Sequence, residues 1–228
     1  MTDPAILAGS PLFYVLLTVI GLAIGAYGTL VGLGGGVILL PALLFLFPGS
    51  SPEVLTGISL AVVFLNAVSG TIAYARQRRI DYRSGLLFAA ATIPSTIIGV
   101  WLVRYIRLSA FSLIFGLLLL AVSILILLRP QFEAPELMSR QKGTLCTLVD
   151  HRGQRFVYRV NRALGTALSF VIGFIAGLLG IGGGVIHVPM MVYLLCFPVH
   201  VATATSHFIL VFTTLAGVLT HLALSTHI

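Results

Sequence analysis

Charged residues are scarce in this chain: they make up 8% of its 228 residues, whereas a soluble domain carries about 25%. Hydrophobic residues make up 58%. They occur in runs of about 20 residues, the length that crosses a hydrocarbon core of about 30 Å as a helix. This shortage of charge excludes an ordinary soluble protein, and the run lengths predict an all-α, polytopic membrane protein.

Cysteines and carboxylates are also few, and each shortage excludes a class of site. The two cysteines form neither a disulfide framework nor a metal motif. The acidic residues all lie in expected loops or at span ends: Asp3, Glu53, Asp81, Glu133, Glu136 and Asp150. Because no carboxylate lies at mid-membrane to bind a cation or relay protons, we predict no metal site. No cofactor is expected either.

Basic residues give the chain a formal charge of +7 and gather between the apolar runs. The clusters lie at 76–83, 104–107 and 129–162. Loops rich in arginine and lysine face the cytoplasm in membrane proteins. This distribution indicates loops between spans and argues against nucleic-acid binding.

The apolar runs divide the chain into spans, which we expect at 53–75, 84–103 and 109–128. An earlier run, 12–47, would be about 54 Å long as one helix, too long for a single crossing. Its glycine cluster at 32–36 divides it into a span, 12–31, and a short helix, 37–47, before a proline-containing turn. Residues 1–11 contain no Lys or Arg, so we expect no signal peptide and a retained first segment.

A polar insert separates two halves of the chain. We expect residues 1–129 to form a first transmembrane repeat, 130–161 a cytoplasmic insert, and 162–228 a second repeat. Within the insert, two β-prone arms of alternating polarity flank Asp150-His151-Arg152-Gly153, which is typical of a small hairpin. We interpret it as a cytoplasmic ornament, with regulatory binding as the alternative.

An internal repeat is the most informative feature of the sequence. GLGGGVILLP at 32–41 returns as GIGGGVIHVP at 180–189, and residues 54–74 overlay 201–221. The loop after residue 75 is basic while its counterpart after His221 is not, which favours inverted repeats. The first half continues into two further spans beyond the point where Ile228 ends the second, so we expect the second repeat to be truncated.

Glycine-broken helices at membrane depth predict a binding site. A break frees backbone groups that lipid cannot satisfy, and paired broken helices mark the central site of transporters. The predicted substrate-binding residues are break glycines and the hydroxyls that follow them: Gly34, Gly35, Gly36, Thr56, Ser59, Gly182, Gly183, Gly184, Thr203, Thr205 and Ser206. Backbone amides and hydroxyls favour an anion. The alternatives are close helix packing for the glycines and ordinary interhelical hydrogen bonds for the hydroxyls.

Two histidines break the symmetry between the halves. Leu39 corresponds to His187, and Leu60 corresponds to His207. Imidazole gains or loses its proton at a pH of about 6.5, and burying this polar ring in lipid costs free energy. Both histidines are therefore candidates for proton coupling or for contact with the anion. The alternative is a neutral histidine bonded to a neighbouring helix. His200, His221 and His227 lie near span ends and are expected at the interface.

At these motifs the chain resembles the TauE/SafE family of sulfite exporters. The resemblance lies in the paired G-x-G-G-G-x-x-x-x-P blocks and in ATATS at 202–206. It covers most of the chain apart from the insert and the missing last part of the second repeat. It implies a multi-pass carrier in a bacterial or archaeal inner cell membrane, acting on sulfite, thiosulfate or an organosulfonate.

We therefore predict a secondary transporter of a small inorganic or organosulfur anion, embedded in the lipid bilayer, coupled to protons and without catalytic residues. A passive anion channel is the alternative, because the same residues could build one. An intramembrane hydrolase is disfavoured because there is no GxSxG motif and no buried acid to orient a base. A monomer and a homo-oligomer are both open at this stage.

Overall fold

The computed structural model describes residues 11–32, 34–127 and 143–225. Its first half contains α2 (Pro11–Val31), α3 (Gly36–Leu46), α4 (Pro52–Arg76), α5 (Tyr82–Val103) and α6 (Leu108–Leu127). Next come β1 (Thr144–Val149), β2 (Arg155–Val160), α8 (Arg162–Leu179), α9 (Gly184–Pro189), the π-helical turn η1 (Met190–Leu194) and α10 (Val199–Ser225). These bounds lie close to those expected from the apolar runs, and the helical, polytopic fold is confirmed.

Side chains of the loops fix where several helices begin. The Ser51 hydroxyl accepts from the Val54 amide ahead of α4, where Pro52 occupies the first helical position. Asp81 caps α5, and Asn161 caps α8 by accepting from the Leu164 amide at 3.1 Å. Such caps satisfy amides that have no partner within the helix. The polar loops therefore set the ends of the apolar helices.

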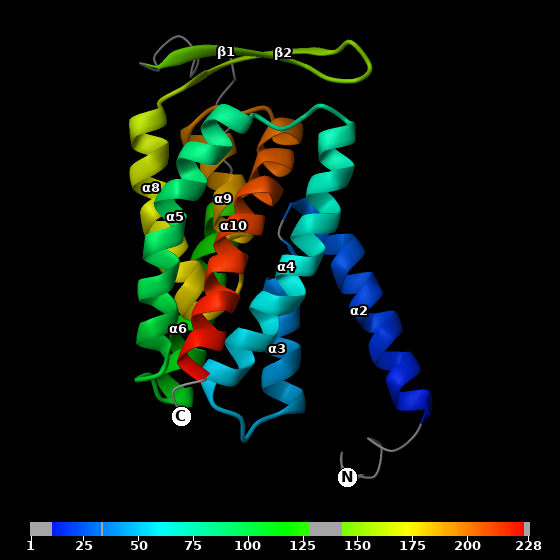
Figure 1. Ribbon diagram of the computed structural model, residues 1–228, viewed down its shortest axis with the longest axis vertical. Helices are drawn as coiled ribbons and strands as arrows, with labels where there is room; N and C mark the ends of the chain where they lie inside the picture. The colour runs from blue at the N-terminus through cyan, green and yellow to red at the C-terminus, as the bar shows by residue number, and fades with distance from the viewer. Residues whose placement is uncertain (1–10, 33, 128–142, 226–228) are drawn as a thin grey trace.

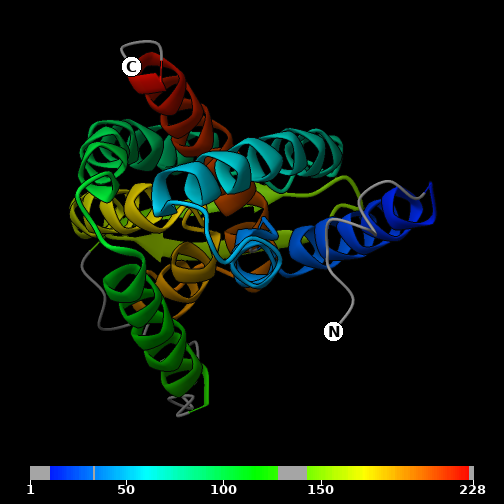
Figure 2. The same ribbon diagram turned by 90° about the horizontal axis from the view of Figure 1, so that it is seen from below.

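In the described part of the chain, five helices are long and apolar enough to cross a membrane: α4, α5, α6, α8 and α10. Seen from one end, α2 and α6 extend outward from the other helices, and so does the C-terminal end of α10 (Figure 2). On α6, Leu113, Leu117 and Leu120 are each more than half exposed. Apolar surface of this kind suits lipid as its solvent.

The two halves run in opposite directions along the long axis (Figure 1). In that view α2 and α4 rise from the lower end, and α3 between them points back down. By contrast, α8 and α10 descend from the upper end, and α9 between them points back up. The inverted relation of the two repeats stays a prediction, to which this arrangement is relevant.

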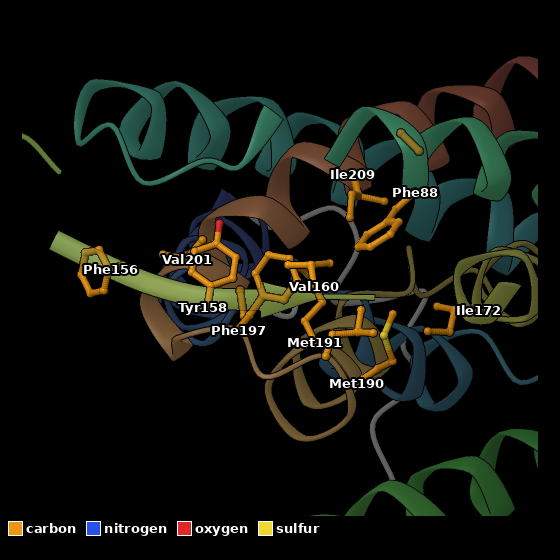
Figure 3. Packing of buried hydrophobic residues seen from close by; sticks show 13 residues of the cluster. Phe88, Phe156, Tyr158, Val160, Ile172, Met190, Met191, Phe197, Val201 and Ile209 are labelled. Carbon is orange, nitrogen blue, oxygen red and sulfur yellow. The ribbon is translucent and has the colours of Figure 1, made fainter. Parts of the chain in front are cut away.

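The hairpin crosses the upper end of the bundle (Figure 1). Its strands pair antiparallel, with Thr144 opposite Val160 and Val149 opposite Arg155. Alternate residues of β2 are buried, and the Tyr158 ring lies against Phe197, with 4.8 Å between ring centroids (Figure 3). The hairpin therefore belongs to the hydrophobic core at this end, which differs from the ornament expected from the sequence.

The hairpin turn is held by Asp150, which is buried. One carboxylate oxygen accepts from Arg79 Nη2 at 3.1 Å, and the other accepts from the amides of Arg152 at 2.8 Å and Gln154 at 3.0 Å. Burial raises the pKa of this carboxyl, but the loop amides and Arg79 outweigh it, so the pKa lies below its ordinary value. The stabilisation is therefore complete above the ordinary pKa and is lost only as pH falls through the lowered one.

Replacing this carboxylate should free the turn at neutral pH. We expect trypsin to cut the Asp150→Ala variant after Arg152 and Arg155 several-fold faster than the unmodified protein. The cleavage rate is measured in detergent by mass spectrometry. The control is Gln154→Ala, because residue 154 contacts Asp150 through its backbone and keeps those bonds. Equal cleavage of the two variants would show that the Asp150 carboxylate does not hold the turn.

Candidate functional site

Each half contains a helix break made of glycines in the left-handed region. The φ angles are 83°, 73° and 83° at Gly32, Gly34 and Gly35, and 69°, 74° and 91° at the matching Gly180, Gly182 and Gly183. A side-chain-bearing residue pays about 1–2 kcal/mol for this conformation. The paired breaks thus share one backbone geometry, and this geometry explains why the glycines recur.

Both breaks also pack closely against the opposite half. A Cβ on Gly32 would lie 2.8 Å from Thr203 Cγ2 of α10, and one on Gly180 would lie 2.7 Å from Thr56 Cα of α4. The breaks touch each other as well, because a Cβ on Gly36 would lie 2.9 Å from the Cα of Ile181. Close packing and an unusual backbone therefore operate together at these glycines.

Short helices start at the breaks. Gly35 precedes α3 and Gly183 precedes α9, and neither helix has a side-chain cap. The first amides of each helix, beginning at Gly36 and Gly184, lack intrahelical acceptors and carry a partial positive charge. The predicted glycines of the two halves are thus brought together at the starts of two oppositely directed helices.

Apolar side chains cover the centre of this region. A Cβ on Gly34 would lie 2.5 Å from Leu210 Cδ2, and one on Gly182 would lie 2.8 Å from Val63 Cγ1. Val63 of α4 and Leu210 of α10 are fully buried. The conformation in the structure is therefore closed over these glycines.

Two of the predicted hydroxyls bind the breaks themselves. Ser59 of α4 donates to the carbonyl of Gly180 at 2.7 Å, and Ser206 of α10 donates to the carbonyl of Gly32 at 3.5 Å. Each serine therefore satisfies a carbonyl that the break in the other half has freed. This matches the alternative interpretation, in which the hydroxyls make interhelical hydrogen bonds.

The threonines have different surroundings. Thr56 donates to the Glu53 carbonyl at 3.0 Å and lies 3.3 Å from Nε2 of His221. Thr205 accepts from the Asp81 amide at 3.0 Å, near the start of α5, so its hydroxyl is directed away from the breaks. His221, which the sequence predicts at the membrane interface, is 7% exposed because Thr56 and Gly57 of the first half pack against its ring.

The two symmetry-breaking histidines are buried. Neither ring nitrogen of His187 has a hydrogen-bond partner within the described part of the chain. His207 Nδ1 lies 3.3 Å from the Thr203 carbonyl, and its ring packs edge-on against Tyr74 with 5.4 Å between centroids. No cluster of three metal-ligating side chains occurs among the described residues.

A cavity of about 480 Å³ lies at the hairpin end, between α2, α4 and α10. Its lining residues are Thr29, Leu30, Ala73, Tyr74, Gln77, Arg79, Val199, His200 and Thr203. Thr203 connects it to the first break, because Gly32 packs on that residue. Sequence reasoning missed Arg79 and His200, although the basic loop at 76–83 was the available signal.

A second cavity, of about 450 Å³, lies at the opposite ends of α4 and α10. Its lining residues are Glu53, Val54, Gly57, Ile58, Ala61, Val218, His221 and Leu222. Under the repeat, Glu53 takes the place of His200, and His221 takes the place of Tyr74. The two cavities are therefore equivalent positions with different charge. Glu53 is paired with Arg104 at 3.3 Å.

The two serines should contribute unequally to stability. We expect Ser59→Ala to lower the free energy of unfolding by about 1–3 kcal/mol, because a buried carbonyl loses its donor, and Ser206→Ala to cost less. The control is Ser169→Ala, since Ser169 is buried and its hydroxyl has no partner among the described residues. Thermal unfolding in detergent measures the difference, and equal losses in the Ser59 and Ser169 variants would refute it.

The comparisons with known proteins agree with this architecture. Residues 17–228 match the family model described as sulfite exporter TauE/SafE. A probable membrane transporter protein of Bacillus subtilis, YunE, is 36% identical over 221 residues, covering 94% of this chain and 80% of the relative. A probable membrane transporter protein of Methanocaldococcus jannaschii is 26% identical over 217 residues, covering 92% and 73%.

No solved structure matches the chain. The relatives are named as transporters, so the prediction of a transporter and not an enzyme is confirmed. The family match covers both helix breaks, the hairpin and five helices able to cross a membrane. The chain belongs to the TauE/SafE family of sulfite exporters and is a multi-pass membrane transporter.

Proposed function

We propose that this chain is a secondary transporter of a small sulfur-containing oxyanion, such as sulfite, thiosulfate or an organosulfonate. The observation that carries the proposal is the meeting of two matched glycine breaks between oppositely directed halves. The family description names sulfite, which supports this class of substrate. We regard residues 1–129 and 162–228 as inverted repeats, as in other transporters with broken helices.

Charge near the breaks supports an anion. The first amides of α3 and α9 offer a positive electrostatic end without a side chain in the way. The cavity at the hairpin end adds the imidazole of His200 and the guanidinium of Arg79, which is also paired with Asp150, and no carboxylate is among the described residues that line it. An anion entering from that end would meet guanidinium, imidazole and hydroxyl groups before it reaches Gly32.

The two cavities suggest how access alternates. They lie at opposite ends of α4 and α10, and Val63 and Leu210 close the space between them. We propose that this is an occluded arrangement, from which rocking of one half against the other opens either cavity to the breaks. The basic loop at 76–83 assigns the hairpin end to the cytoplasm of an inner membrane.

His207 is the stronger candidate for proton coupling. Its partners Thr203 and Tyr74 both line the cavity at the hairpin end, so a change of charge on its ring would act on the residues along the anion's route. His187 lies at the other break, beside Gly183, and has no hydrogen-bond partner among the described residues. We propose it as a second candidate.

The break glycines can be tested by comparing leucine substitutions. We expect Gly35→Leu and Gly183→Leu to abolish uptake of labelled sulfite into proteoliposomes, because leucine is strained at positive φ. Folded protein should still reach the membrane. The control is Gly116→Leu in α6, where nothing lies within 4 Å of an added Cβ. If both break variants take up sulfite as fast as the control, the glycines serve helix packing and not substrate binding.

The coupling ion can be tested by imposing a pH gradient. We expect flux of labelled sulfite or thiosulfate to follow the gradient, and His207→Leu, which copies Leu60 of the first half, to weaken that dependence more than it weakens anion binding. The control is His151→Gln, which replaces an exposed histidine of the hairpin turn. If flux through the unmodified protein does not depend on the gradient, a passive channel is favoured. If the His207→Leu variant keeps the same gradient dependence, His207 has no part in the mechanism.

A further inference from the structure

A third cavity, of about 480 Å³, lies under β1 at the first turns of α5 and α8. Its lining residues are Ile80, Asp81, Tyr82, Arg83, Thr144, Leu145, Cys146, Thr147, Leu148, Tyr158 and Arg162. It shares no residue with the two cavities on either side of the helix breaks. We propose that it binds a small oxyanion of the sulfate or phosphate type, at a site separate from the transport site.

Among the described residues that line this cavity, positive charges outnumber negative charges by one. Arg83 and Arg162 supply two cations, and Asp81 supplies the only carboxylate of this described lining. Asp81 is already engaged: its oxygens accept from the Ser84 amide and hydroxyl, at 3.2 and 2.7 Å, and from the Tyr158 hydroxyl at 3.1 Å. Within the described part of the chain, neither arginine forms an ion pair with a carboxylate.

Arg162 carries an unmet hydrogen-bond donor. Its Nη2 contacts the Cys146 sulfur at 3.8 Å, but its Nε is buried and has no acceptor among the described residues. A buried guanidinium N–H without an acceptor is costly, and an oxyanion is the ligand whose geometry best satisfies this group. Arg162 thus lines the cavity and carries a buried donor that has no acceptor among the described residues.

The helix ends increase this need for negative charge. Arg162 is the first residue of α8, and Arg83 lies in the first turn of α5. Neither first turn contains an acidic residue, but the carboxylate of Asp81 at the N-cap already faces the positive end of α5, whereas α8 begins after the neutral Asn161. A cation at the positive end of a helix dipole is unfavourable, and α5 and α8 start side by side at the hairpin end (Figure 1). An anion between the two arginines would relieve the repulsion at the start of α8.

Strand β1 supplies neutral donors on the same wall. Thr144 and Thr147 add hydroxyls to the two guanidinium groups, which suits a ligand with several oxygen atoms. A free sulfate or phosphate has this chemistry, and so does the phosphate of an anionic lipid headgroup at the membrane surface. The ligand class is the same for both sources, and experiment can separate them.

Cys146 provides a reporter within the cavity. Its thiol is partly buried. Burial, followed by Asp81, raises its pKa, whereas Arg162 and Arg83 act to lower it. A bound oxyanion would cover the sulfur and would also neutralise the arginines that favour the thiolate. Both effects should slow alkylation of this thiol.

The test measures N-ethylmaleimide alkylation of Cys146 in a Cys196→Ala background, which leaves one thiol. Protein in uncharged detergent is compared in sodium sulfate, inorganic phosphate and sodium chloride at equal ionic strength. We expect sulfate or phosphate to slow alkylation several-fold, and Arg162→Gln to lose this protection. The control, Arg159→Gln, changes an exposed arginine of β2 and should keep it. Arg83→Gln is the second variant, for use where Arg162→Gln does not fold.

The source of the anion is separated in nanodiscs without sulfate or phosphate. Protection in detergent identifies a soluble oxyanion. Protection that appears only when phosphatidylglycerol is added to phosphatidylcholine, and that Arg162→Gln or Arg83→Gln abolishes, identifies a lipid phosphate. Unchanged alkylation under all these conditions, or protection that persists in both arginine variants, would overturn the proposal. Because no step measures flux, the outcome is independent of the proposed transport function.

Discussion

The structure depends on one constraint: a backbone broken at membrane depth must find hydrogen-bond partners inside the protein, because lipid offers none. Here the partners come from the other half of the chain. Ser59 and Ser206 each donate to the carbonyl at the opposite break, over 121 and 174 residues of sequence. Each break therefore takes part of its hydrogen bonding from the other half, which favours assembly of the two halves around the same place.

This reciprocal arrangement explains several features together. The breaks need glycine for their φ angles and also because α4 and α10 approach them without room for a Cβ. The same close approach brings the starts of α3 and α9 together, so the positive ends of two helices face one region. The packing that satisfies the fold therefore also creates the electrostatic environment that we assign to the anion.

Helix positions and the two breaks could be predicted from the sequence, because both depend on local signals. Apolar runs gave the spans, and the repeated GGG motif gave the breaks. The partners of individual side chains could not be predicted in this way. His221 is buried by Thr56, a residue 165 positions away, and Thr205 bonds the cap of α5. The role of the hairpin was within reach, since Phe156, Tyr158 and Val160 alternate with polar neighbours and indicate one buried face.

The hairpin links helices at one end of the molecule, so the two ends differ in how firmly their helices are held together. At its end of the molecule, Asp150 is tied to Arg79 after α4, and Tyr158 joins Asp81 before α5 to Phe197 before α10. At the other end, the ion pair between Glu53 and Arg104 links neighbouring segments of the first half. Symmetric repeats alone would give inward-open and outward-open states of similar free energy. In the alternating-access scheme that we propose, contacts across one end remove that equality, so the hairpin between the proposed repeats would set the resting preference of the carrier.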